Sequence, residues 1–301
     1  MSEVNMRARI RVALAALAAL FATACDLEDF GPGNRYREDF RQSFDMPPGG
    51  RLAVENANGS VDIRGWEQDK IEVSGVKYAA TQDLLKAVRI EVSVAGGVAQ
   101  VRTVRPSSRG NYGVNYVIRL PRKVNLDKIV STNGAIRVED VEGQGRLSTT
   151  NGAIRVSRFL GRLDADTTNG AVELYSLEGA VSVRTSNGAV RGENIRGNMQ
   201  ASTTNGTIEA RIAETGPPRL MRFSTSNGSI KLTFEQIKSA DIRAATTNGT
   251  ITLRLPPAAG ARLNARTSNA AISSDFDVKA KGEIPKKRLE GVIGAGGQLI
   301  D

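Results

Sequence analysis

The stretch that decides the fold reads Thr149-Thr150-Asn151-Gly152-Ala153-Ile154. Its Asn step recurs in nearly fixed context along the chain, at Asn133, Asn151, Asn169, Asn187, Asn205, Asn227, Asn248 and Asn269. The successive spacings are 18, 18, 18, 18, 22, 21 and 21 residues. A more distant copy begins at Asn58. Self-similarity at a fixed period of this size is the signature of stacked repeats, so the repeat predicts the architecture.

Apolar and hydroxyl residues recur in columns around each Asn. Four residues before it the chain carries Ile129, Leu147, Ala165, Val183, Ala201, Phe223, Ala244 and Ala265. Two residues before it stand Ser131 and then Thr149, Thr167, Thr185, Thr203, Thr225, Thr246 and Thr267. Three residues after it stand Ile136, Ile154, Val172, Val190, Ile208, Ile230, Ile251 and Ile272. This alternation with a period of two predicts a half-buried strand on each side of the Asn.

The Asn-Gly steps are expected to form one corner of each repeat, because Asn and Gly both tolerate positive φ. The candidate corner residues are Asn133, Gly134, Asn151, Gly152, Asn169, Gly170, Asn187, Gly188, Asn205, Gly206, Asn227, Gly228, Asn248 and Gly249. A short third side follows, with the apolar column Val141, Phe159, Leu177 and Ile195. Gly143, Gly161, Gly179 and Gly197 come two residues later and indicate a second corner.

One repeat is too small to fold alone. It offers about five inward side chains, each contributing about 1.5–3 kcal/mol. Ordering 18 backbone positions costs at least about 18 kcal/mol. Neighbouring repeats must supply the difference, so the sequence predicts an all-β fold, a parallel β-helix or solenoid with repeats of about 18–22 residues. Asn-Gly is also a strong hairpin signal, and an antiparallel β-meander of Asn-Gly hairpins is the alternative.

The first 24 residues are expected to be a signal peptide. Arg7, Arg9 and Arg11 precede the short apolar run 12–24, which is too short to span a bilayer as a helix. Met1 or Met6 could be the true start. The single cysteine, Cys25, follows Ala24 and resembles the lipidated cysteine of a bacterial lipobox. Residues 25–44 would then be a lipidated tether, and the protein a membrane-anchored lipoprotein of the cell envelope, on the periplasmic side or the cell surface.

The remaining boundaries follow the change in pattern. Residues 45–125 are expected to form a β segment that packs on or caps the solenoid. Residues 126–278 hold the Asn-Gly repeats, and residues 279–301 form a basic, Gly-rich tail.

Composition excludes several classes of site. The chain has no His and one Cys, which removes the commonest general base and any Cys-rich metal site, so we expect no cofactor and no metal. The formal net charge is +9. Expected export and the low aromatic content, 5%, argue against nucleic acid as a partner.

Three features together resemble a bacterial family of candidate adhesins built from β-strand repeats. They are the opening segment 48–66, the serial Thr-Thr-Asn-Gly-Ala-Ile units, and the closing segment 291–297. The resemblance covers about residues 45–301. It implies a β-helix-like domain, association with the envelope and no established enzymatic activity. Ala270 departs from the pattern, because it replaces the Gly of the last unit, and we expect a distorted corner there.

The function hypothesis is a non-catalytic binding, adhesive or scaffolding role, with a glycan or another envelope protein as partner. It rests on outward polar positions such as Arg137, Arg155, Glu173, Arg191, Glu209 and Lys231. One alternative is a carbohydrate-active lyase or hydrolase, for which Asp164 and Asp166 are the candidate carboxylates. Another is a self-assembling structural or envelope-signalling component. The sequence leaves the ligand, the oligomeric state, the handedness of the solenoid and the choice of inner or outer membrane open.

Overall fold

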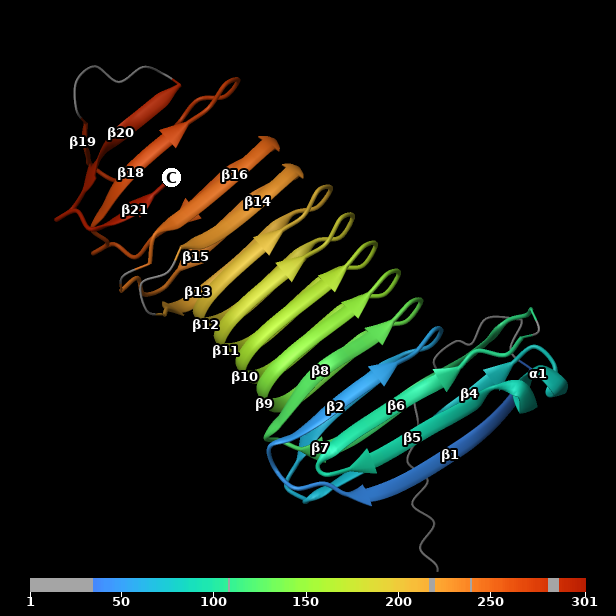
Figure 1. The fold of residues 1–301 in the computed structure, drawn as a ribbon. Helices are drawn as coiled ribbons and strands as arrows, with labels where there is room; N and C mark the ends of the chain where they lie inside the picture. Colours follow the sequence, from blue (N-terminus) through green and yellow to red (C-terminus); the bar gives the residue numbers. More distant parts are fainter. Residues whose placement is uncertain (1–34, 108, 217–219, 239, 281–286) are drawn as a thin grey trace, which may run out of the picture. The chain divides into compact units, whose positions relative to one another are not determined.

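The structure is a computed structural model that describes residues 35–107, 109–216, 220–238, 240–280 and 287–301. Cys25 and the expected signal peptide lie outside these residues. Within them the fold is all-β, with one short helix, and its central part is a parallel β-solenoid of about seven turns (Figure 1). The predicted fold class is therefore confirmed.

The first part of the chain forms seven strands and the helix. The strands are β1 (Tyr36–Asp45), β2 (Gly50–Glu55), β3 (Val61–Trp66), β4 (Lys70–Ala79), β5 (Arg89–Ala95), β6 (Val98–Val104) and β7 (Tyr112–Pro121). The helix, α1 (Gln82–Ala87), begins after Thr81, whose side chain accepts a hydrogen bond from the amide of Leu84.

The regular repeats follow as five strands. They are β8 (Val124–Ser131), β9 (Ile136–Thr149), β10 (Ile154–Thr167), β11 (Val172–Arg184) and β12 (Val190–Ser202). Successive members pair in parallel with matched columns, for example Ile154 beside Ile136 and Val172 beside Ile154. This register excludes the meander of Asn-Gly hairpins, which requires antiparallel neighbours.

The longer repeats are split into shorter strands. They are β13 (Ile208–Thr215), β14 (Met221–Asn227), β15 (Ile230–Phe234), β16 (Ile242–Asn248), β17 (Ile251–Arg254), β18 (Ala261–Arg266), β19 (Val278–Ala280), β20 (Arg288–Ile293) and β21 (Gln298–Ile300). The extra residues lie between β13 and β14 and between β15 and β16, while the parallel pairing of β12 with β14 and of β14 with β16 continues past them.

Each regular turn of the solenoid has three sides around an apolar interior. The third-side column of Val141, Phe159, Leu177 and Ile195 is buried, as is the column three residues after each Asn from Ile136 to Ile230. Gly143, Gly161, Gly179 and Gly197 have positive φ and form a corner at the end of the third side. The remaining corner is built from residues with left-handed backbone that are not Gly: Asp140, Arg158, Ser176 and Asn194 have φ between 50° and 58°.

Chain order differs from spatial order at both ends of the stack. β2 and β3 lie between β6 and β7 on one side and β8 and β9 on the other. Antiparallel strands β5, β4 and β1 then cover that end. At the other end β21 lies between β16 and β18, and β20 pairs antiparallel with β18. The stretch expected to be a tail therefore contributes strands β20 and β21 to this end.

All described strands and core residues fall within the compact unit Gly33–Asp301. The unit contains its own hydrophobic core and antiparallel strands beyond the outer coils, which is what a domain needs to fold alone.

Candidate functional site

The Asn side chains of the repeats form one continuous ladder along a corner of the solenoid. Each Nδ2 donates to the Oδ1 of the Asn one turn earlier, at 2.6–2.8 Å, through Asn58, Asn133, Asn151, Asn169, Asn187, Asn205, Asn227 and Asn248. Asn58 ends the ladder by donating to the backbone carbonyl of Tyr112 at 2.9 Å. Within the ladder an amide group uses one N–H and one oxygen lone pair, so a second N–H and a second lone pair are left for solvent or a ligand.

At the seven ladder positions from Asn133 to Asn248, the following Gly is required by close packing and not, as expected from the sequence, by positive φ. None of Gly134, Gly152, Gly170, Gly188, Gly206, Gly228 and Gly249 has positive φ. A Cβ at each of them would lie 1.8–2.1 Å from the carbonyl oxygen of the corresponding Gly one turn earlier. Close approach of two backbones therefore selects Gly at this corner.

The buried hydroxyl column closes the same corner from inside. Thr167 Oγ1 donates to the carbonyl of Gly152 at 3.0 Å, and Thr185 Oγ1 donates to that of Gly170 at 3.0 Å. The same bond recurs from Thr149, Thr203, Thr225 and Thr246. These Thr side chains are mostly buried, so this column supports the backbone and offers nothing to a ligand.

A second hydroxyl column lies on the outside, one residue before each Asn. It consists of Thr132, Thr150, Thr168, Ser186, Thr204, Ser226 and Thr247, all exposed except the half-buried Thr132. We call this column and the eight ladder Asn residues the Asn edge. The Asn edge carries amides and hydroxyls without a charge, and its eight turns extend over about 34 Å at the usual strand spacing of about 4.8 Å.

The outward charged column beyond the Asn edge is largely occupied with itself. Arg155 lies 2.6 Å from Glu173. Glu209 lies 3.0 Å from Lys231 and 3.8 Å from Arg191, and the hydrogen bond from Lys231 holds its pKa below the ordinary value. These residues were expected to face a ligand, and instead they pair along the stack.

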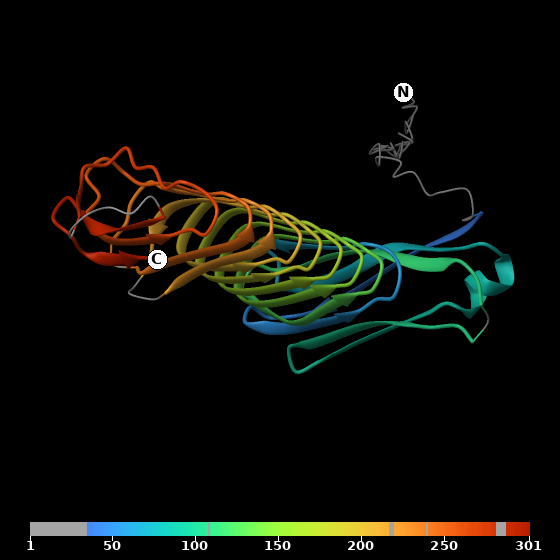
Figure 2. The same ribbon diagram turned by 90° about the horizontal axis from the view of Figure 1, so that it is seen from above.

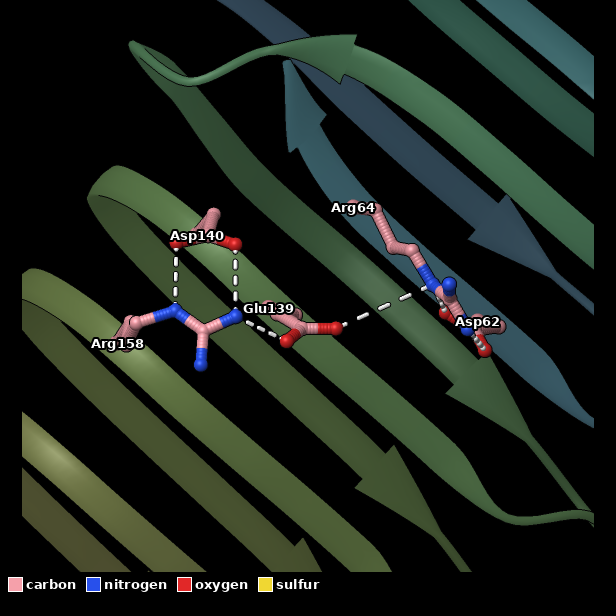
Figure 3. Close-up of polar contacts among 5 residues, drawn as sticks. All are labelled: Asp62, Arg64, Glu139, Asp140 and Arg158. Atoms are coloured by element: carbon pink, nitrogen blue, oxygen red, sulfur yellow. Dashed lines mark hydrogen bonds and ion pairs between the residues drawn. The ribbon is translucent and has the colours of Figure 1, made fainter.

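Figure 3 shows the same behaviour where β3 meets the first regular turns. Arg158 donates from Nε and from Nη2 to the two carboxylate oxygens of Asp140, at 2.8 and 2.9 Å, and also contacts Glu139. Arg64 donates to Asp62 and lies 4.0 Å from Glu139. The bonds from Arg158 lower the pKa of Asp140, and those to Asp140 and Glu139 raise the pKa of Arg158.

The ion pairs of this cluster account for the left-handed backbone of Asp140 and Arg158. Asp140 and Arg158 occupy the left-handed corner, where an L residue is strained by roughly 1–2 kcal/mol. Stacked corners place the two side chains side by side, and the charge-assisted bonds offset the strain. The Asp and Asn at two of the four positions were the available signal for this corner, since both tolerate the left-handed region better than most residues.

The two candidate carboxylates of the enzyme alternative line an open hollow of about 400 Å³. Asp164 lies 3.3 Å from Arg162, and Asp166 lies 3.4 Å from Arg184. Asp127, on the same hollow, pairs with Arg51 at 2.5 Å. Each of these three carboxylates thus has a basic partner, whereas a glycosidase pair needs two carboxyl groups that face the scissile bond.

Among the residues that the structure describes, no group of three or more His, Cys, Asp and Glu side chains could hold a metal ion. No helix in this described part of the chain has the length and the apolar character that crossing a bilayer requires.

Comparison with known proteins gives a structural likeness and a family. No curated protein matches the chain. A solved structure described as a candidate adhesin, from Bacteroides fragilis, is 13% identical, with 73% of this chain and 94% of that one covered and a TM-score of 0.41. A candidate cell adhesion protein from Clostridium sporogenes is 12% identical, with 72% and 100% covered and a TM-score of 0.27.

A family model described as Toastrack DUF4097 matches residues 49–301. This agrees with the resemblance of the opening, repeated and closing segments to β-strand-repeat proteins. The chain belongs to the Toastrack DUF4097 family.

Proposed function

We propose that this protein is an envelope lipoprotein, anchored through Cys25, whose solenoid binds a glycan-like polymer along the Asn edge without catalysis. The observation that carries the proposal is the unbroken ladder from Asn58 to Asn248. It holds amide donors and acceptors in a fixed row beside exposed hydroxyls. A rigid row of this kind lowers the entropy that binding must overcome.

The chemistry of the Asn edge favours a polar, uncharged and repetitive partner. Sugar hydroxyls both donate and accept hydrogen bonds, and each turn presents one free N–H and one free acceptor from its Asn. A single turn binds weakly. A polymer that engages several turns at once gains from multivalency, because each further contact is intramolecular.

The state of the carboxylates supports a non-catalytic role. Asp164 and Asp166 are each paired with an arginine, and the hollow that they line is open to solvent. A general acid for glycoside cleavage needs a raised pKa and a nearby carboxylate of different environment. The loss of measured glycan cleavage in Asp164→Asn and Asp166→Asn variants would favour the enzyme instead.

The anchoring part of the proposal rests on the only cysteine of the chain, which directly follows the signal-like segment 1–24. Mass spectrometry of the mature protein from membrane fractions tests it. We expect an N-terminal Cys25 that carries acyl chains, and a soluble protein with a free or missing Cys25 would overturn it.

Binding is tested with the folded unit 33–301 in pull-downs on purified peptidoglycan and on an array of neutral glycans. We expect retention that falls at least severalfold in the variant Thr150→Val, Thr168→Val, Ser186→Ala. The matched control is Ser148→Ala, Ser182→Ala, Ser202→Ala, which removes hydroxyls from another outward column and should bind as wild type. Absence of retention on every glycan, or equal loss in both variants, would refute the Asn edge as the binding surface.

A further inference from the structure

One end of the N-terminal strands gathers several connections. Tyr36, at the start of β1, lies beside Ala79 at the end of β4, and Ala79 lies beside Tyr112 at the start of β7. Helix α1 links β4 to β5, and residues 105–107 and 109–111, between β6 and β7, lie at the same end (Figures 1 and 2). Gly110 packs next to Leu84 of the helix.

Exposed basic side chains collect on these connections. They are Arg35, Lys86, Arg89, Arg105 and Arg109, which we call the basic end. Arg89 is paired across the strands with Val104, the residue before Arg105. None of the five forms an ion pair with any residue that the structure describes, whereas many charges of the solenoid faces, such as Arg155 and Glu173, are paired.

Among the residues that the structure describes, few acidic side chains balance this end. Asp83 lies in the first turn of α1, where it also interacts favourably with the helix N-terminus, and Glu38 is paired with Lys77 at 2.9 Å. The opposite end of the same strands is different. There exposed Asp45, Glu67 and Asp69 stand among the basic residues, and Glu67 pairs with Arg122 at 2.8 Å.

The basic end is also where the described chain begins. Arg35 lies ten positions after Cys25 in the sequence. Even a fully extended segment of this length spans at most about 35 Å. An acylated Cys25 would therefore keep this end close to the bilayer. Exposed Tyr36 is the type of residue that is enriched at membrane interfaces.

We propose that the basic end docks on the anionic phospholipid headgroups of the membrane that carries the lipid anchor. The proposal rests on the proposed anchoring for its setting, and on the unpaired charges for its chemistry. Docking at this end fixes which side of the solenoid meets the membrane, and a short tether alone would leave that side undetermined.

The expected strength follows from the number of charges. A basic residue near an anionic surface raises membrane partition about fivefold at physiological salt. The attraction decays within a Debye length of about 8 Å, so the residues that do not touch the surface contribute little. If two of the three residues Arg89, Arg105 and Arg109 make full contact, partition should rise about 25-fold over that on neutral lipid.

The test uses the unlipidated unit 33–301 in co-sedimentation with vesicles of phosphatidylglycerol and phosphatidylcholine, and with vesicles of phosphatidylcholine alone. We expect partition on the anionic vesicles that weakens as salt is raised. The variant Arg89→Gln, Arg105→Gln, Arg109→Gln should lose at least tenfold. The control Arg146→Gln, Arg222→Gln, Arg254→Gln removes three exposed arginines elsewhere, with the same change in net charge, and should keep wild-type partition.

Each outcome of this experiment either supports or overturns docking through the basic end. Equal partition on the two vesicle types, or equal loss in both triple variants, overturns docking through this end. Binding to a soluble polyanion such as heparin without binding to anionic vesicles also overturns it and indicates an acidic polymer instead. Because the unit 33–301 lacks Cys25, a lack of binding to anionic vesicles would not contradict lipidation at Cys25. Likewise, an unlipidated mature protein would not change the result of the vesicle experiment.

Discussion

The substitution Gly170→Ala tests why glycine follows the ladder Asn. Gly170 lacks positive φ, and for such a Gly the loss of freedom in the unfolded chain predicts that Ala stabilises the protein by about 0.4–1 kcal/mol. The structure predicts the opposite sign. A Cβ at Gly170 would lie 1.8 Å from the carbonyl oxygen of Gly152, whereas real Cβ contacts are essentially never under 3.0 Å.

The magnitude follows from the contacts that cross this corner. The two turns would have to separate by about 1.2 Å, the difference between 3.0 and 1.8 Å. Three hydrogen bonds span the gap: Thr167 to Gly152 at 3.0 Å, the Asn169 side chain to Asn151 at 2.7 Å, and the Asn169 amide to Thr150 at 2.9 Å. At about 1 kcal/mol each their loss costs about 3 kcal/mol. After the gain in the unfolded chain, a net destabilisation of about 2 kcal/mol remains.

The assay is urea unfolding of the unit 33–301, followed by circular dichroism. Gly145→Ala is the matched control. Gly145 is also buried with no positive φ, but the three atoms nearest to its added Cβ would be side-chain atoms of Leu163 and Phe159, at 3.1–3.3 Å. We expect a lower urea midpoint for Gly170→Ala and a clearly smaller change for Gly145→Ala, because side chains can shift by a few tenths of an ångström more easily than backbone. A Gly170→Ala protein as stable as wild type, or as Gly145→Ala, would refute the close-approach explanation.

Three further predictions concern hydroxyl, amide and phenol groups. Thr167→Val should lower the free energy of unfolding by about 1–3 kcal/mol, because it leaves the Gly152 carbonyl without its buried donor. Thr168 is exposed, so Thr168→Val should change this free energy by no more than about 0.5 kcal/mol in the same urea titration. Asn169→Asp removes the donor to Asn151 and should lower thermal stability more than Asn269→Asp, whose residue lies outside the ladder; equal effects would contradict a stabilising ladder. Burial raises the pKa of Tyr116 to about 12, above the value of about 10 in the unfolded chain, so its contribution to stability is complete below pH 10 and is lost as pH rises from 10 to about 12. That loss should amount to roughly 2–3 kcal/mol and should be absent in Tyr116→Phe, as urea midpoints across this pH range would show.

Much of the fold was predictable because local pattern and stacking point the same way. The column that contains Ile154 and Val172 repeats at a fixed period, and only parallel stacking brings every member inside. The third-side column with Phe159 follows by the same reasoning. Large and small side chains also match inside the solenoid. The ring of Phe159 lies next to Gly145, which leaves space where the next turn carries Leu163.

Other features depend on contacts that a single repeat does not encode. The place of Asn269 is one. It follows the period, yet β21 lies between β16 and β18 and separates the last unit from the rest of the stack. The strand that does so comes from the end of the chain, where Asp301 accepts a hydrogen bond from Asn264 at 2.7 Å. The spacing of repeats gives only their order along the chain. It does not show that a strand from the C-terminal end pairs between two earlier strands.

Stacking of the repeats also determines which polar residues stay available to bind a partner. A charged column such as Arg155 and Glu173 looks like a ligand surface when each repeat is considered alone. Stacking places opposite charges one strand spacing apart, so the column satisfies itself and has little left for a partner. An Asn column also pairs with itself, but an amide has two donors and two acceptor sites, and one of each stays free. The repeated surface that remains available for binding is therefore the uncharged one. Among the described charges without an ion pair, Arg105 and Arg109 lie on connections that no neighbouring turn repeats, so stacking supplies them with no partner.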